Sequence, residues 1–523
     1  MASVLLPHLA LGRKLYCEAF IKTYVGLMQF SSASLNPVPG LNVFNSLSKK
    51  KSQVFTKHPN VLTWYICGPT VYDYSHIGHA WCYVNFDIMK RIMEQYFDLN
   101  VVQKLDFKEV SSKYEIAFLN DLDNLSVQRP NVLTKVTDFI PQIILFIENL
   151  LHQKLAYTNE DGSVYFNLNA YSKKYKYGKL KPSLIPQMDV ENLNCNEDFA
   201  LWKAAKSSLE PSWSPSWGGK GRPGWHIECS AMASHIFGSW VDVHSGGIDL
   251  LFPHHENEEA QCCAYHGISQ WVGHWIHSNL LHLPNGAKMS KSLKNSITVK
   301  EFLQTYSAEQ FRMMCVISNY RNGMDFTEDS LRLAKEMLDT FRKFITECRF
   351  YIRNTSSCQS SIDSNLLFTA LEETKSMVRV HLGDDFNTAQ ATSVVQKLVQ
   401  LTRKEIHALN TLNTTNPNCG IAAVASVSNF VSKYLNSLGF MSIGISVDSA
   451  GSDSASIIDD FVGFRSQIRQ HALAMKKNDK IDSVNTKKIL LTACDKLRED
   501  LKHKGIQLKV VMLDLLQLFS SVN

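Results

Sequence analysis

The first regular pattern along the chain is a short apolar run followed by a helical repeat. Val61 to Cys67 reads VLTWYIC and ends at Gly68-Pro69, which predicts a buried strand and a turn. Apolar residues then recur at helical spacing from Trp81 to Tyr96, and Leu99 to Gln103 is a second short apolar run. This order predicts the first half of a parallel α/β sheet.

A second half of such a sheet is predicted further along the chain. Trp240 to His244 is a short apolar run between two helical stretches, and Gly246-Gly247 after it predicts a loop. The intervening part is mostly helical and irregular, with one predicted strand in GSVYFNL (162–168). We therefore expect a Rossmann-like α/β domain over residues 41–325, with an insertion at about 108–206.

Beyond about Asp325 the pattern is amphipathic and helical almost throughout. Three polar stretches interrupt it: RNTSSCQSSIDS, NTLNTTNPN and SVDSAGSDSAS. We expect stem helices and a linker over residues 326–364, followed by an all-α helical bundle over residues 365–523.

The N-terminal stretch differs from the rest in composition. It is rich in apolar and hydroxyl residues and carries Arg13, Lys14 and Lys22 with a single acid, Glu18. This composition suits a mitochondrial presequence over residues 1–40 and predicts the mitochondrial matrix; a flexible N-terminal extension is the alternative. No apolar run approaches the ~20 residues of a membrane-spanning helix, so we expect no membrane contact.

Composition sets limits on the partner and the compartment. With 523 residues, 45% of them hydrophobic, the chain has material for several large cores. The net charge of +5 is modest, so any contact with nucleic acid must come from local clusters of basic residues. The 12 cysteines are scattered without a CxxC motif, which favours reduced thiols in an intracellular compartment.

The stretch FPHHENEEAQ, from Phe252 to Gln261, offers ligands for a metal ion. His254 and Glu258 are four residues apart, so on a helix both side chains leave the same face. Cys67 and Cys229 each lie where the chain leaves an apolar element, beside a Gly- or Pro-rich turn. Two thiolates, an imidazole and a carboxylate form an ordinary zinc set. The alternative is that His254 caps the helix and Glu258 is solvated.

Two further motifs suit a nucleotide phosphate. HIGH, from His76 to His79, opens the first predicted helix, where Gly78 permits close approach and the helix N-terminus favours negative charge. KMSKS, with Lys288 and Lys291, lies in a polar loop and offers two ammonium groups to a polyphosphate. The alternatives are two capping histidines and a solvated basic loop.

Together these motifs resemble the class I aminoacyl-tRNA synthetases and, within them, the cysteinyl-tRNA synthetase family. The resemblance runs from about Asn45 to the C-terminus. It rests on CGPTVYD with SHIGH, on GRPGWHIECSAM, on HSGGIDLLFPHHENE, on KMSKSLKN and on DDFNT (384–388). The presequence favours a mitochondrial member of the family.

The resemblance implies an ATP-dependent ligase that activates L-cysteine as an adenylate and transfers it to tRNA(Cys). It implies one zinc ion held by Cys67, Cys229, His254 and Glu258, which binds the thiolate of the substrate and so rejects serine. Gly68 and Trp225 would contact the substrate cysteine, with Trp225 closing over it; a core tryptophan is the alternative.

The resemblance also implies how ATP, arriving with Mg²⁺, is bound. Gly246, Gly247 and Asp249 would line the adenosine pocket, where the alternative for the glycines is a tight turn. The HIGH residues His76, Gly78 and His79 would stabilise the α-phosphate, and Lys288 and Lys291 would neutralise the departing pyrophosphate. No general base is required, because a carboxylate is already a nucleophile.

The helical C-terminal region would bind the anticodon arm of the tRNA, and we expect a monomer. Its basic residues would contact phosphates, unless they simply form a solvated surface. They are Lys476, Lys477, Lys487, Lys488, Lys496, Arg498, Lys502 and Lys504.

One departure from the family supports a competing hypothesis. The family carries a segment of the type Asn-Ile-Thr-Asp-Ile-Asp-Asp-Lys-Ile-Ile after the strand that ends near Gln103, and here the chain continues directly into KLDFKEVSSKYEIAFL. A chain without that segment could be a pseudo-enzyme or impaired isoform that binds zinc, ATP or tRNA. A ligase that joins cysteine to a small amine is a third reading, disfavoured by the long helical region.

Overall fold

The computed structural model of the chain describes most of the polypeptide between residues 35 and 441. The described ranges are 35–71, 74–109, 112–181, 198–207, 210–283, 296–353, 362–408 and 420–441, with short stretches at 468, 487–496, 499, 506–511 and 515–520. The expected presequence therefore lies almost entirely outside the described residues.

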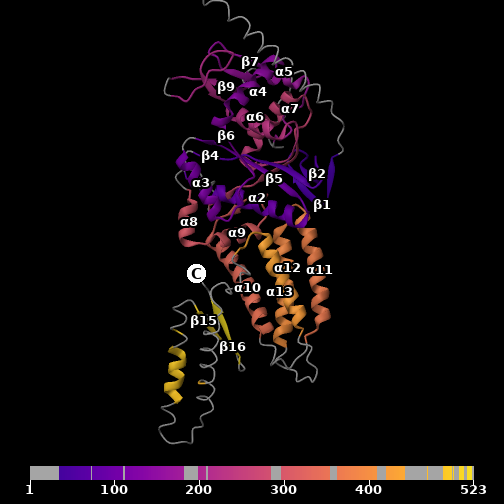
Figure 1. Ribbon diagram of the computed structural model, residues 1–523, viewed down its shortest axis with the longest axis vertical. Coiled ribbons are helices and arrows are strands. Elements are labelled where there is room, and N and C mark those ends of the chain that lie inside the picture. The colour runs from indigo at the N-terminus through magenta and orange to yellow at the C-terminus, as the bar shows by residue number, and fades with distance from the viewer. Residues whose placement is uncertain are drawn as a thin grey trace, which may run out of the picture.

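A parallel sheet forms the centre of the molecule (Figure 1). Its strands run in the order β12-β11-β3-β5, and β5 pairs further with β6 and β4. Every pairing in this sheet is parallel. The strands are β3 (Val61–Ile66), β4 (Thr70–Val71), β5 (Asn100–Glu109), β6 (Val132–Lys135), β11 (Val241–Gly247) and β12 (Val272–Ser278).

This strand order confirms the expected α/β sheet built from two halves. Of the strands in this sheet, β3 comes first in sequence and lies in the middle. The chain adds β5 and β6 on one side of it and β11 and β12 on the other. The connections after β3 and β11 therefore leave in opposite directions, which opens a crevice at the carboxyl ends of these two strands. Ligands of open α/β sheets bind at such a point.

Apolar side chains pack on both faces of the sheet. Trp64 and Ile66 belong to one buried cluster and Tyr65 to another, as expected for alternate residues of a strand. Helix α2 (Ile77–Tyr96) contributes to the first cluster, whereas α4 (Ile140–His152), α6 (Trp225–Phe237) and α7 (Glu256–His266) contribute to the second. The sheet is thus covered by helices on both faces.

The insertion contains more strand than the sequence predicted. A four-stranded antiparallel sheet runs in the order β10-β9-β8-β7, and only β8 was expected. These strands are too short to give a clear period-2 pattern, and β6 joins the parallel sheet instead. Their bounds are Ala156–Thr158 (β7), Val164–Phe166 (β8), Phe199–Ala204 (β9) and Gly221–Pro223 (β10).

An antiparallel hairpin precedes the parallel sheet. It consists of β1 (Asn36–Asn45) and β2 (Lys50–Thr56), so β1 begins inside the range assigned to the presequence. Asp385, in the DDFNT turn, accepts a hydrogen bond from the Phe44 backbone N–H at 2.9 Å. The hairpin is thereby joined to the helical region.

Helices dominate the rest of the described chain, as the amphipathic pattern predicted. They pack beside the sheet and share one apolar cluster with α2 (Figure 1). No described helix is long and apolar enough to cross a membrane. The helices are α8 (Val299–Thr305), α9 (Ala308–Val316), α10 (Glu328–Arg353), α11 (Ser364–Gly383), α12 (Thr388–Ala408) and α13 (Ile421–Ser437).

The C-terminal region is not all helical, however. Two strands, β15 (Ile506–Val511) and β16 (Leu515–Ser520), form an antiparallel hairpin. The sequence of β15, IQLKVV, alternates apolar and polar residues at its start, which is the period of a strand rather than of a helix. The three polar stretches predicted between helices lie mainly outside the described residues.

Candidate functional site

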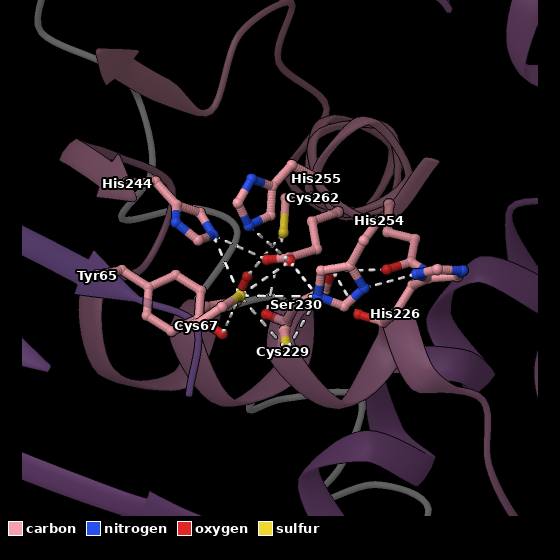
Figure 2. Close-up of polar contacts among 12 residues, drawn as sticks. Tyr65, Cys67, His226, Cys229, Ser230, His244, His254, His255 and Cys262 are labelled. Atoms are coloured by element: carbon pink, nitrogen blue, oxygen red, sulfur yellow. Dashed lines mark hydrogen bonds and ion pairs between the residues drawn. The ribbon is translucent and has the colours of Figure 1, made fainter. Parts of the chain in front are cut away.

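Four possible metal ligands meet in the crevice between β3 and β11 (Figure 2). The Sγ atom of Cys67, directly after β3, lies 3.8 Å from Sγ of Cys229, 3.6 Å from Nε2 of His254 and 3.3 Å from Oε1 of Glu258. His254 Nε2 is in turn 3.6 Å from Cys229 Sγ and 2.9 Å from Glu258 Oε1. Segments far apart in the sequence thus bring together the four residues that the sequence grouped.

The alternative in which Glu258 is solvated is wrong. Every residue from Glu256 to Ala264 in α7 is buried, and the side chain of Glu258 is 0% exposed. Each acid has a partner, because Glu256 accepts from the backbone N–H groups of Gly178 and Leu180, and Glu259 pairs with Lys179 at 3.1 Å. Buried carboxylates are tolerated only when they are paired in this way.

The donor distances suit a small, thiophilic cation. Donors arranged tetrahedrally around zinc lie roughly 3.3–3.8 Å apart, given Zn–S bonds of about 2.3 Å and Zn–N bonds of about 2.0 Å. The four contacts of the two thiols fall in this range, whereas the His254–Glu258 contact of 2.9 Å is that of a direct hydrogen bond. The residues therefore fit a zinc ion, with a small adjustment of one pair.

His255 is a further candidate donor. A cluster of mutually close donor atoms can also be drawn with His255 in place of Cys229. Its Nε2 is buried without a hydrogen-bond partner and lies 4.0 Å from Glu258 Oε1. We favour Cys229, since its Sγ lies 3.8 Å from Cys67 Sγ and 3.6 Å from His254 Nε2, as around tetrahedral zinc, whereas His255 Nε2 lies 4.0 Å from Glu258 Oε1.

The electrostatics of the site are those of a cation-binding cluster. Burial opposes ionisation of Glu258, yet the imidazoles of His244 and His254 hold its pKa well below the ordinary carboxyl value. Burial also disfavours a charged imidazole, but Glu258 and Cys229 outweigh it and raise the pKa of His254 to about 10. Without a metal ion, a proton supplies the positive charge that this cluster requires.

Sequence reasoning missed an outer group of imidazoles. His226 Nδ1 lies 2.8 Å from His254 Nδ1, and His244 Nε2 lies 3.0 Å from Glu258 Oε2. Burial, with the neighbouring His254, lowers the pKa of His226 to about 3, and burial, with His244, lowers the pKa of His277 to about 3. These neutral rings can orient the ligands. The sequence signals were the position of His226 beside Trp225 and of His244 at the end of a predicted strand, whereas His277 had none.

The HIGH residues line a cavity of about 220 Å³ next to the metal cluster. His76 is the N-cap of α2, where its Nδ1 accepts from the Gly78 N–H at 3.1 Å, and its ring stacks on that of His79 at 3.8 Å. The alternative of two capping histidines is therefore correct, and the same two residues line the cavity. A Cβ atom at residue 78 would meet the His76 ring at 2.9 Å, so glycine is required.

Gly246, Gly247 and Asp249 line the same cavity, together with Cys67 and Gly68. The two glycines end β11 instead of forming the predicted loop. A Cβ on Gly246 would lie 2.7 Å from the His255 ring, so the reason for glycine here is close packing rather than a turn.

Trp225 also lines this cavity and is not a core residue. It is 52% exposed at the start of α6, and its ring stacks on the His254 ring with centroids 4.5 Å apart. The alternative of a core tryptophan is wrong, and the position suits a ring that covers a small ligand.

Several predicted residues lie outside the described part of the chain. Lys288 and Lys291 fall there, as do most of the C-terminal basic residues, of which Lys487, Lys488 and Lys496 are described. Where the family segment is missing, β5 continues without interruption to Glu109 and keeps its pairing with β3, β4 and β6. Lys104 in this strand is fully buried, with Nζ 4.0 Å from the centre of the Tyr65 ring.

Comparisons with known proteins identify the family of the chain. Residues 53–336 match the family model described as "tRNA synthetases class I (C) catalytic domain". The chain is 36% identical over 507 residues to a "Probable cysteine--tRNA ligase, mitochondrial" of Xenopus tropicalis, covering 90% of this chain and 88% of that one. It is 33% identical over 495 residues to a "Cysteine--tRNA ligase" of Methanococcus maripaludis, covering 90% and 97% of the two chains.

Solved structures support the fold alone. The methionyl-tRNA synthetase of Mycobacterium tuberculosis in complex with methionyl-adenylate matches with a TM-score of 0.59 at 11% identity, covering 74% of this chain and 92% of that one.

Cytoplasmic relatives also match, among them a "Cysteine--tRNA ligase, cytoplasmic" of Dictyostelium discoideum at 36% identity over 506 residues, covering 88% of this chain and 72% of the relative. Sheet order, motif positions and these relatives together show that the chain belongs to the cysteine–tRNA ligase family of class I aminoacyl-tRNA synthetases.

Proposed function

We propose that this chain activates L-cysteine with ATP and transfers it to tRNA(Cys) in the mitochondrial matrix. The observation that carries the proposal is one cavity lined by the HIGH residues, the end of β11 and Cys67, which belongs to the buried Cys-Cys-His-Glu cluster. Such a site can bind a nucleotide and a thiol-containing amino acid side by side.

Cys67, Cys229, His254 and Glu258 would hold a zinc ion at the base of the crevice. A zinc ion there would supply a soft Lewis acid that prefers a thiolate to a hydroxyl, which gives selectivity for cysteine over serine. Trp225 would cover the bound amino acid from above, and the Gly68 backbone would border it.

The same crevice would then orient the reaction with ATP and Mg²⁺. The carboxylate of cysteine attacks the α-phosphorus, the bond to pyrophosphate breaks, and a cysteinyl-adenylate forms. The α2 N-terminus with His76, Gly78 and His79 would stabilise the charge on the α-phosphate, and Lys288 and Lys291 that on the pyrophosphate. Gly246, Gly247 and Asp249 would border the adenosine.

In the second step a ribose hydroxyl at the 3′ end of the tRNA attacks the carbonyl carbon of the adenylate, and AMP leaves. The helical region and the C-terminal lysines would hold the anticodon arm, and we propose a monomer. The mitochondrial assignment is supported by the basic, acid-poor N-terminal composition and by the mitochondrial relative.

ATP–pyrophosphate exchange tests the proposal. The protein should lack residues 1–34 but keep Asn36, where β1 begins. Exchange is measured with cysteine and with serine in parallel, and zinc is quantified in the same sample. We expect exchange with cysteine only and about one zinc ion per chain. A folded, zinc-loaded protein without exchange would instead support the pseudo-enzyme hypothesis that the missing segment suggested.

A further inference from the structure

A fully buried lysine lies in the parallel sheet, close to the candidate metal ligands. Lys104, on β5, is 0% exposed, although lysine is almost never fully buried unless its charge is compensated. It directly follows Gln103, the point at which the family segment is missing. The reason for its burial must therefore lie in the structure of this chain.

The register of the sheet places Lys104 in a row with two other side chains. Lys104 of β5 pairs with Tyr65 of β3, and Tyr65 pairs with His244 of β11. Paired residues of adjacent parallel strands project to the same face, so these three side chains are neighbours. Nζ of Lys104 lies 4.0 Å from the centre of the Tyr65 ring, and the rings of Tyr65 and His244 have centroids 4.1 Å apart.

This row reaches two of the four candidate metal ligands (Figure 2). The hydroxyl oxygen of Tyr65 lies 3.6 Å from Cys67 Sγ, and His244 Nε2 lies 3.0 Å from Glu258 Oε2. A cysteine that binds a metal ion is a thiolate, so the Tyr65 hydroxyl would then donate to Cys67. Tyr65 is therefore placed to hold this ligand in position.

The charge of Lys104 suits this arrangement. Two thiolates and a carboxylate around a divalent ion leave one net negative charge in a buried cluster, which is unfavourable unless it is compensated. An ammonium group over the face of Tyr65 is attracted to the ring and supplies positive charge on this side of the cluster. It also withdraws electron density from the ring, which makes the hydroxyl a stronger donor.

We propose that Lys104 and Tyr65 form an outer-shell pair, in which Lys104 acts through Tyr65 to position Cys67 and to balance the charge of the metal cluster. Both are positioning residues, because neither would contact the ion. The inference rests on the proposed function for the zinc ion but not for catalysis.

A double-mutant cycle on the full chain tests the pair. Lys104→Met and Tyr65→Phe each remove one functional group and keep most of the side-chain volume, and the third variant combines them. Zinc affinity is measured by competition with a chromophoric chelator. Thermal unfolding is measured on the same zinc-loaded proteins.

Two variants outside the metal cluster serve as matched controls. Lys90→Met removes another buried lysine, on α2, and Tyr434→Phe removes a buried hydroxyl on α13 that contacts Thr392 Oγ1 at 2.8 Å. Helices α2 and α13 contribute to the first apolar cluster, whereas Cys67 belongs to the second.

We expect Lys104→Met and Tyr65→Phe each to weaken zinc binding by about tenfold, the lower end of the range for loss of an outer-shell partner. The combined variant should also lose about tenfold rather than about a hundredfold, because one residue acts through the other. Lys104→Arg keeps the charge and should restore most of the affinity. Both control variants should bind zinc like the wild type.

Three results would overturn the proposal: unchanged zinc affinity in either single variant, losses that multiply in the combined variant, or an equal loss in Lys90→Met. If Lys104→Met does not fold, Tyr65→Phe and Lys104→Arg decide, since lost affinity in the first and near-normal affinity in the second are both required.

The outcome is separate from that of the proposed function. A wild-type chain that binds zinc but shows no ATP–pyrophosphate exchange would contradict catalysis and leave the cycle valid, because zinc affinity is measured without ATP. A wild-type chain that binds no zinc would overturn this inference whatever its exchange activity.

Discussion

At the scale of single residues, a control variant can separate the role of Cys229 as a metal ligand from the effect of its burial. Cys262 is a matched control, since it lies in the same region, is fully buried, and hydrogen bonds to Ser234 at 3.5 Å. Burial raises the pKa of the Cys262 thiol well above its ordinary value, so it stays protonated.

We therefore expect Cys229→Ala to lose zinc and Cys262→Ala to keep it. The loss should exceed the roughly 10–100-fold weakening caused by removal of an outer-shell partner. Zinc affinity is measured by competition with a chromophoric chelator, and cysteine affinity by the concentration dependence of exchange. Full zinc retention by Cys229→Ala would remove this residue from the site and leave His255 as the better candidate.

The protonation of His254 predicts how zinc binding depends on pH. Burial disfavours its charged form, but Glu258 and Cys229 raise its pKa to about 10, so at neutral pH the metal-free site holds a proton. Zinc needs the neutral imidazole and two thiolates, and its binding must release protons. Affinity should therefore rise with pH, by about tenfold per unit for each proton released, between about pH 6 and pH 8.

Calorimetry in two buffers of different ionisation enthalpy counts the protons released. A zinc affinity that does not change with pH, together with no proton release, would show that the ligands are already deprotonated in the metal-free protein.

At the scale of elements, one buried arginine joins four segments. Arg312 on α9 is 1% exposed and donates to Asp87 of α2 at 2.5 Å, and to the carbonyl groups of Leu438, Leu125 and Ser126. No local pattern indicates this role, because Arg312 and Asp87 are far apart in the chain.

Arg312→Met should lower the free energy of unfolding by about 3 kcal/mol, the lower end of the range for a broken buried pair, because Arg91 still pairs with Asp87 at 2.8 Å. Urea unfolding measures the change. Arg332→Met, which breaks only exposed pairs with Asp329 and Glu336, is the control and should leave the midpoint unchanged. Equal midpoints for both variants would contradict the role of Arg312.

At the scale of the whole molecule, the turn 384–388 joins the β1–β2 hairpin to the helical region. Asp385 is 2% exposed and accepts from the Phe44 N–H, from the Tyr320 hydroxyl at 2.7 Å and from Arg321 at 2.7 Å. Both Asp385 and Phe386 adopt the left-handed conformation, with φ of 59° and 51°, which turns this carboxylate inward.

Asp385→Ala should destabilise all these parts together, by about 3–5 kcal/mol, because it removes a buried acceptor from three donors. Exchange activity should be lost at the same lower temperature as secondary structure, although Asp385 lies outside the catalytic crevice. Asp384→Ala is the matched control, since the Asp384–Lys51 pair is exposed and should contribute little. Separate transitions for activity and helicity would show that the parts unfold independently.

The sequence by itself determined the central strands β3, β5 and β11, the long helices and the four candidate ligands, whereas β4, β6 and β12 were not predicted. Continuous apolar runs such as VLTWYIC and helical repeats are local signals, and His254 and Glu258 are held together by helical spacing. The resemblance of the motifs to one family supplied candidate residues for a nucleotide site, and the described ones line one cavity.

Only the tertiary structure decided the rest, because it depends on contacts between distant segments. Burial of the polar helix α7, the outer histidines, and the four short strands of the insertion have no local pattern. Gly246 of β11 is needed because the His255 ring packs against it, not because the chain turns there. The anchoring of the lysine-rich segment 172–181 likewise depends on buried acids of α7, which lie about 80 residues away in sequence.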